Sequence, residues 1–374
     1  MASRQEICLS ASTKLAAAKV AAVKGVIGFD GFVDSIIDVV DKRSSATEYD
    51  RVHTLSQLGQ KISMAAGQSA NMELFVKMQK LGGNGPIMAN AMAAMGFGIT
   101  YIGNLGFPEP HAVFTDMTKR ATVISIAEPG YTDALEFQDG KLMLGKHQSL
   151  RDVTWANILK IVGSEKLLKA CDDADLLGMV NWTMLPFMTD IWSHLLSDVL
   201  PKLSKKNRRV FIDLADPEKR LVEDIRGALA MLQKINEKVH VILGLNLSEA
   251  VQVNEALGLP KVGNPEGEIE KLAVQLRGKL DLGTVVVHPR KGAAAANKEG
   301  SASFAGPFVQ QPKISTGAGD HFNAGFVTGQ LLGLNLAESL CTGTGTSGYY
   351  VRNAESPSAA QLAAFVKDLP APQG

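Results

Sequence analysis

The chain has 374 residues, of which 45% are hydrophobic and 20% charged, as expected for a globular protein with a large core. Its 38 lysines and arginines balance its 38 aspartates and glutamates, and no basic run marks a surface for nucleic acid or lipid. The three cysteines are far apart and form no C-x-x-C motif, which argues against a zinc site and a disulfide framework and indicates reduced, buried thiols.

The N-terminal segment is rich in alanine, but three lysines interrupt it, so it lacks the continuous apolar core of a signal peptide. Ser10 or Ser12 is expected to cap a helix that runs to about residue 23. No segment approaches the apolar length needed to span a bilayer. We therefore expect a cytoplasmic protein with no membrane partner and no nucleic-acid partner.

Short strands dominate the first half of the chain. The hydrophobic pattern predicts strands at 26–29, 32–40, 99–102, 123–127, 134–138 and 142–145, and helices at about 70–81 and 86–95. Asp139-Gly140, between the last two strands, is a two-residue hairpin signal.

A regular alternation of strands and helices begins near residue 176. Strands are predicted at 176–180, 210–213, 239–243 and 284–287, and helices at 186–200, 217–235, 248–257, 266–278, 318–332, 337–351 and 358–368. This pattern predicts an α/β fold with a parallel sheet covered on both faces by helices. The β-rich segments at about 32–42 and 121–146 do not fit the alternation and would form a small sheet beside the main one. We expect residues 1–374 to form a single domain.

The segment Ser315–Phe326 carries the clearest chemical signal. Gly317 and Gly319 permit a tight turn, and the first N–H groups of the helix that follows favour an anion. Asp320 then places a carboxylate beside that anion. An anion cradle with an adjacent base suits phosphoryl transfer to a hydroxyl. The four residues Gly-Ala-Gly-Asp by themselves are equally compatible with an ordinary turn.

The longer string resembles the second signature of the ribokinase (PfkB) family of carbohydrate and nucleoside kinases. The resemblance implies that Asp320 is the base facing the acceptor hydroxyl and that the backbone amides of Gly317, Ala318 and Gly319 form the anion hole. It also implies a ribokinase-like three-layer α/β/α fold, in which the small sheet is a lid over the sugar, with ATP and Mg²⁺ as cofactors.

A second glycine-rich segment, Gly82-Gly83-Asn84-Gly85, precedes a predicted helix. A plain loop between two helices would have the same composition. The segment also resembles the first signature of the family, a loop that holds the hydroxyls of the sugar. The resemblance implies that Gly82, Gly83 and Asn84 bind the substrate. Where the family commonly has a further asparagine, this chain has Ile87.

Two aspartates, Asp30 and Asp34, flank the end of the first predicted strand. Ligands bind at the carboxyl ends of strands in open α/β sheets, and carboxylates accept charge-assisted hydrogen bonds from hydroxyls. We expect both residues to bind the substrate, with Asp30 the stronger candidate. The alternative is that they are turn aspartates beside Gly31.

Asn246 and Glu249 follow the strand at 239–243 and have the spacing of a helix capping box, which needs no ligand. They also match the Asn-x-x-Glu motif of the family, which implies a role in binding Mg²⁺ and phosphate. Mg²⁺ usually keeps several waters, so few protein ligands are expected. Asp213 is a weaker candidate for the same region.

Two glycines are predicted to border the nucleotide. Gly292 follows the strand at 284–287 at a position where the family has a glycine next to the nucleotide. Gly345 lies in a Gly-x-Gly-x-x-Gly string, but the helix predicted before it excludes a dinucleotide-binding fold. Small residues there would instead let a helix approach the adenine. His288 and His321 are predicted to be non-catalytic.

The sequence thus predicts a kinase that transfers the γ-phosphoryl group of ATP to a hydroxyl of a sugar or sugar-like alcohol. A nucleoside kinase, an ADP-dependent sugar kinase and a non-catalytic sugar-binding or regulatory protein remain alternatives. Ile314 stands where many members of the family have an aspartate near a monovalent-cation site, which argues against activation by potassium. Exposed strand edges of the lid make a homodimer plausible. The identity of the acceptor stays open.

Overall fold

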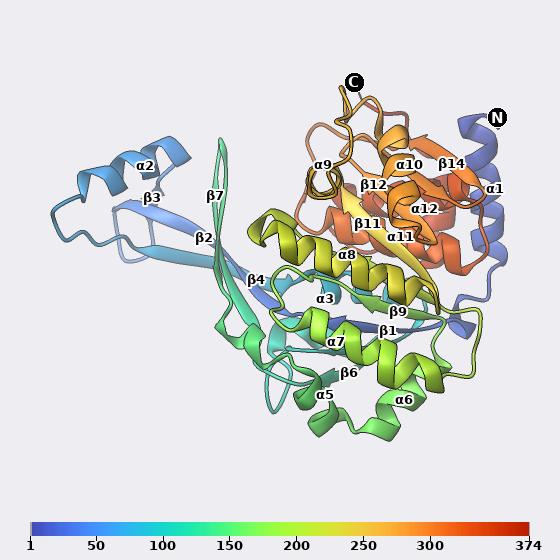
Figure 1. Ribbon diagram of the computed structural model, residues 1–374. Coiled ribbons are helices and arrows are strands. Elements are labelled where there is room, and N and C mark those ends of the chain that lie inside the picture. The colour runs from blue at the N-terminus through green and yellow to red at the C-terminus, as the bar shows by residue number, and fades with distance from the viewer. Residues whose placement is uncertain (1, 374) are drawn as a thin grey trace.

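The computed structural model describes residues 2–373, and a large sheet forms the centre of its body (Figure 1). The strand order is β14-β13-β12-β11-β10-β9-β1-β5-β6. The bounds are β1 (Lys24–Phe29), β5 (Gly98–Gly103), β6 (Thr122–Ser125), β9 (Leu176–Met179), β10 (Arg209–Asp213), β11 (His240–Asn246), β12 (Thr284–His288), β13 (Gly292–Asn297) and β14 (Gly300–Ala305). Pairings from β6 to β12 are parallel, and β13 and β14 add an antiparallel hairpin.

Helices cover both faces of this sheet, and the strand residues alternate between two cores. In β10, Val210 and Ile212 pack into one core and Phe211 into the other. The first core includes α5 (Trp155–Val162), α6 (Ser164–Asp173), α7 (Met188–His194), α8 (Val222–Asn236), α9 (Leu247–Ala256) and α10 (Ile269–Leu280). The second includes α1 (Arg4–Ala17), α3 (Asn84–Ala94), α11 (Ala318–Leu331), α12 (Leu336–Asn353) and α13 (Ala359–Lys367). The predicted three-layer α/β/α architecture is confirmed.

A smaller sheet projects from the body and carries α2 (Leu55–Met64) at its far end (Figure 1). Its strands are β2 (Phe32–Arg43), β3 (Tyr49–Arg51), β4 (Leu74–Gly82), β7 (Gly130–Phe137) and β8 (Gly140–Lys146). The order is β3-β2-β7-β8, and β4 pairs with the other edge of β2. This is the predicted lid, and α2 within it was not anticipated.

Several predicted elements differ from the structure. The helix expected at 70–81 is strand β4, whose apolar residues are exposed on both faces and so lack the alternation of a half-buried strand. Part of the lid segment expected at 121–146 is β6, which pairs with β5 in the large sheet. The lid hairpin turns through residues 138–139, because Phe137 pairs with Gly140. The β13–β14 hairpin was not predicted.

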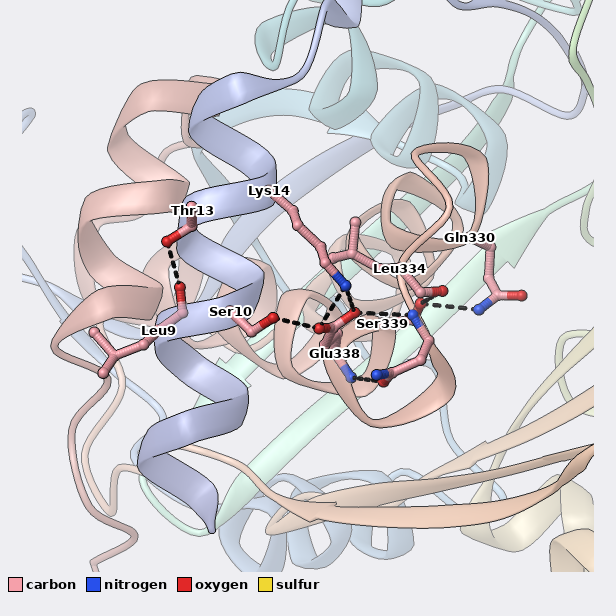
Figure 2. A network of polar contacts seen from close by, with 9 residues as sticks. Leu9, Ser10, Thr13, Lys14, Gln330, Leu334, Glu338 and Ser339 are labelled. Carbon is pink, nitrogen blue, oxygen red and sulfur yellow. Dashed lines mark hydrogen bonds and ion pairs between the residues drawn. The ribbon is translucent and has the colours of Figure 1, made fainter. Parts of the chain in front are cut away.

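Helix α1 begins earlier than predicted. Ser3, not Ser10 or Ser12, is its N-cap, because Ser3 and Glu6 form a reciprocal capping box. Ser10 and Ser12 instead anchor α1 to the C-terminal helices. Ser10 and Lys14 donate hydrogen bonds to Glu338 at the start of α12 (Figure 2). No helix within residues 2–373 is long and apolar enough to cross a membrane.

Candidate active site

A cavity of about 440 Å³ lies at the carboxyl ends of the parallel strands, where α11 begins. Three of its walls are the last residues of successive strands: Asp213 of β10, Asn246 of β11 and His288 of β12. Gly292 of β13, the first turn of α11 and one face of α12 complete the lining. The position agrees with the expectation that ligands bind beyond the carboxyl ends of strands in an open α/β sheet.

The turn before α11 has the backbone that its glycines predict. Gly317 is the N-cap of α11 and has a φ of 89°, in the left-handed region. A β-carbon at this position would also lie 3.3 Å from Ile87, so the two signature segments touch here. Ala318, Gly319 and Asp320 line the cavity. The N–H of Ala318 donates to the Ser315 carbonyl, whereas the first turn of a helix leaves further N–H groups for an anion.

Asp320 is buried at the floor of this cavity. Burial, together with the negative charges of Asp30 and Glu249, raises the pKa of its carboxyl to about 8. One hydrogen bond opposes this shift, because the Asn84 side-chain amide donates to Asp320 Oδ1 at 2.9 Å. The structure therefore joins the two predicted signature segments through a side-chain contact, and gives Asp320 an unusually high affinity for a proton.

The hydrogen bonds around Asp30 differ from those expected of a residue that binds the substrate. It is fully buried and accepts hydrogen bonds from the N–H groups of Asn84 and Gly85, at 3.0 and 2.8 Å, and from the side chain of Asn181 at 2.8 Å. These donors make Asp30 the anchor of the first turn of α3. We expected Asp30 to be the stronger substrate-binding candidate, but its lone pairs are largely occupied.

Asp34 lies beside the first glycine of the loop. Its carboxylate lies against the backbone of Gly82, where a β-carbon would overlap it. Burial raises its pKa, and the positive charges of Lys80 and Lys141 oppose that shift. The glycine loop thus does two things: Gly82 makes room for Asp34, and Gly83, with a φ of 95°, turns the chain into α3 at Asn84.

Asn246 and Glu249 form the capping box of α9 and also line the cavity. The Glu249 N–H donates to Asn246 Oδ1 at 3.0 Å, and the Asn246 N–H donates to Glu249 Oε2 at 2.9 Å. Burial raises the pKa of Glu249. The structural and the ligand-binding interpretations of this pair are therefore compatible.

A third acidic group, Asp213, faces the same cavity. It accepts hydrogen bonds from Ala215 N–H and the Asn323 side chain, and burial together with the charges of Glu249 and Asp320 raises its pKa strongly. Among the residues that the structure describes, no three acidic, histidine or cysteine side chains converge on one ion position. The separated oxygens of Asp213 and Glu249 fit Mg²⁺ that keeps most of its waters.

Only one of the two glycines predicted to border the nucleotide lines the cavity. Gly292 lines the cavity, and a β-carbon there would lie 2.7 Å from the Phe304 carbonyl oxygen. Gly345 faces away, since its β-carbon would lie 2.7 Å from Val366 of α13. The helical period of α12 brings Thr344, Ser347 and Gly348 to the cavity instead.

Some residues of the site were missed in the sequence. His288 lines the cavity and stacks on Phe322, with ring centroids 4.6 Å apart, and burial lowers its pKa to about 4. Lys141 of the lid donates to Thr316 Oγ1 at 2.8 Å, one residue before the N-cap of α11. The predicted hairpin could have indicated that Lys141 lies opposite Glu136, but its contact with Thr316 joins segments 175 positions apart and has no local signal.

Comparisons with known proteins agree with this geometry. Residues 4–369 match the family model described as prokaryotic ketohexokinase. A ketohexokinase from Haloferax volcanii is 30% identical over 344 residues, which cover 91% of this chain and 90% of that protein.

Solved structures with the same architecture share less sequence. A carbohydrate kinase from Agrobacterium tumefaciens (17% identity, 93% of this chain and 98% of that one) has a TM-score of 0.63. A phosphofructokinase-2 mutant from Escherichia coli (14%, 92% and 98%) has a TM-score of 0.64. A ribokinase from Arabidopsis thaliana complexed with ribose and ATP (14%, 92% and 98%) has a TM-score of 0.61. These similarities confirm the ribokinase-like fold.

Proposed function

Because this chain belongs to the prokaryotic ketohexokinase family, and with it to the ribokinase-like sugar kinases, we propose that it transfers the γ-phosphoryl group of ATP to a hydroxyl of a ketohexose. The observation that carries the proposal is the position of Asp320. Its carboxyl lies buried in the cavity at the start of α11 and is bound by Asn84 of the glycine loop. Phosphoryl donor and acceptor would meet there.

Asp320 acts as the base in this proposal. The acceptor hydroxyl gives its proton to the carboxylate as its oxygen attacks the γ-phosphorus, and the bond to the departing ADP oxygen breaks. The raised pKa of about 8 makes the carboxylate form of Asp320 a stronger base than a free aspartate. The amides of Gly317 and Gly319 would face the charge that develops on the transferring group, whereas that of Ala318 would have to leave the Ser315 carbonyl to join them. The dipole of α11 would add to their effect.

The acidic groups of the cavity suit a magnesium nucleotide. Asp213, Asn246 and Glu249 would hold Mg²⁺, mostly through waters, and the bound ion would neutralise phosphate charge. The phosphates would lie between this cluster and α11, and the adenine between Gly292 and the face of α12 that carries Thr344 and Gly348.

Two copies of the chain would associate through the lid. Apolar side chains are exposed along both of its outer strands: Leu74, Phe75, Val76 and Met78 of β4, and Leu142, Met143 and Leu144 of β8. Edge strands with such side chains favour pairing with another chain. Light scattering of the purified protein tests this; a monomer at micromolar concentration would contradict it.

A substrate panel tests the proposed activity. The protein is assayed with Mg²⁺ and either ATP or ADP against ketohexoses, aldoses, sugar phosphates and nucleosides, and the product is located by ³¹P NMR. We expect ATP with a ketohexose to give the highest kcat/KM. A preference for nucleosides, or for ADP as donor, would replace the proposal with one of the alternative kinases. Sugar binding without turnover would indicate a non-catalytic protein.

A further inference from the structure

The strand register of the lid brings five polar side chains to one face. Asp34 of β2 lies opposite Lys80 of β4 and is aligned with Thr132 of β7. Side chains at paired positions share a face of a sheet, and residues two apart along a strand do so as well. Glu136, four residues after Thr132, therefore joins them, with Lys141 opposite it on β8. We call these five residues the inner lid face.

This face is turned toward the candidate active site. Lys141 Nζ reaches the body and donates to Thr316 Oγ1 at 2.8 Å, next to the anion-hole turn. At the other end, the Asp34 carboxylate lies against Gly82, the first glycine of the loop that leads to Asn84. A sugar bound beside the Asn84–Asp320 pair would therefore lie against this face.

The two lysines of the inner lid face differ in their partners. Lys141 binds Thr316 and forms an ion pair with Glu136 at 3.2 Å. Lys80 has no hydrogen bond and no ion pair within 4.0 Å among residues 2–373, although Asp34 is near enough to raise its pKa. Burial acts in the opposite direction and lowers that pKa overall. An ammonium has three donors, and leaving all of them unmet in a half-buried position is unfavourable.

We propose that Lys80 recognises the acceptor, by donating a hydrogen bond to one oxygen of the bound sugar while Asp34 accepts one from a neighbouring hydroxyl. The inference rests on the proposed function and adds a specificity-determining residue to it. A donor and an acceptor side by side would distinguish sugars by the configuration of two adjacent oxygens. The nearby carboxylates of Asp34 and Glu136 balance the two ammonium groups, so the face suits an uncharged acceptor more than a sugar phosphate.

The variant Lys80→Met removes the ammonium and keeps most of the side-chain volume. We expect the KM for the acceptor to rise about tenfold to a hundredfold, as for the loss of one charge-assisted hydrogen bond. kcat and the KM for ATP should change less than about threefold. Lys80→Arg should recover part of the affinity, because it restores a cationic donor.

Lys77→Met is the matched control. Lys77 lies on the same strand, but its ammonium already has a partner in the protein, because it is paired with Asp38 at 3.1 Å. We expect its acceptor KM to stay within about twofold of the wild type. Deoxy sugars add a second readout: the analogue that lacks the contacted oxygen should bind equally weakly to the wild type and to Lys80→Met, whereas the other analogues should still distinguish them.

Three results would overturn the inference. The first is an unchanged acceptor KM in Lys80→Met, and the second is an equal rise of that KM in Lys77→Met. The third is that the wild type binds a sugar phosphate more tightly than the uncharged sugar and that Lys80→Met abolishes this preference. The measurements use whichever acceptor the wild type phosphorylates, so the failure of ketohexose as substrate does not decide the role of Lys80. If the wild type phosphorylates no acceptor, calorimetric titration of the two proteins with the same sugars gives the comparison.

Discussion

The body and the lid contribute to one site from very different surroundings. In β10, which ends at Asp213 in the cavity, Val210 to Asp213 are all buried. In β4, which ends at the glycine loop, the six residues from Leu74 to Gln79 are exposed. Groups on the body are fixed by packing before any ligand arrives, whereas a sheet with few buried contacts opens more readily. We therefore expect chemistry to depend on the body, and selectivity and water exclusion to depend on the lid.

The largest effect should come from the base on the body. Asp320→Asn keeps the shape of the side chain and its contact with Asn84 but cannot accept the hydroxyl proton. We expect kcat to fall by about 10³-fold, with ATP affinity nearly unchanged. Asp133→Asn, on the lid and paired with exposed Lys146, is the control and should stay near the wild-type rate. Turnover of Asp320→Asn close to that control would remove the proposed base.

Two chemically identical capping boxes allow a sharper test of the magnesium proposal. Asn246 and Glu249 begin α9 at the cavity, and Asn335 and Glu338 begin α12, where Glu338 is bound by Lys14 of α1 (Figure 2). Glu249→Gln should raise the Mg²⁺ concentration for half-maximal activity about tenfold.

Glu338→Gln should leave that Mg²⁺ requirement unchanged, although we expect both variants to lower the free energy of unfolding, by roughly 1 kcal/mol for the cap alone. Equal Mg²⁺ requirements in the two variants would mean that Glu249 is only a helix cap.

A smaller effect is expected from the contact between the lid and the body. Lys141→Met removes the hydrogen bond to Thr316, so the lid should close less completely over the transferring group. We expect kcat to fall roughly fivefold and ATP hydrolysis without sugar to rise relative to kcat. Lys146→Met is the control, because Lys146 lies on the same strand as Lys141 and its ion pair with Asp133 of β7 is exposed. An unchanged ratio of hydrolysis to transfer would separate Lys141 from closure.

The smallest effect concerns stability and pH. The pKa of Asp320 is about 8 in the folded protein and near 3.8 when unfolded, so between these values the folded state holds a proton that the unfolded state has released. Its contribution to stability is therefore present below pH 3.8 and is lost as pH rises toward 8. Asp320→Asn should melt at a progressively higher temperature than the wild type over this range. A difference in Tm that does not depend on pH would contradict the raised pKa.

The sequence was most informative for the body. Its alternation of apolar strands with amphipathic helices predicted the layers, and the string around Asp320 predicted the turn, the helix start and the family. The lid was harder, because β4 is an edge strand with apolar residues on both faces and its pairing with β2 outweighs its local pattern.

The surroundings of the predicted site residues could not be derived from the sequence for a related reason. Gly345 was predicted from a glycine-rich string. Which residues of α12 face the cavity depends on how the helix is rotated about its own axis, and Gly345 lies on the other side. Asp30 and Asp34 are similar in sequence, and their difference arises from three donors that fold onto Asp30 from α3 and from Asn181. Such contacts between distant segments cannot be derived from one strand and its turn.

The attachment of α1 has a consequence for the order of events during synthesis. Lys14 binds Glu338 across 324 positions of the chain, and Ser12 binds the Ala363 carbonyl across 351. Helix α1 leaves the ribosome before α12 and α13, the helices that cover it. Its docking must therefore wait until both have been synthesised, and until then its apolar side is exposed to chaperones. A protein shortened at its C-terminus before α12 should leave α1 undocked and sensitive to proteases.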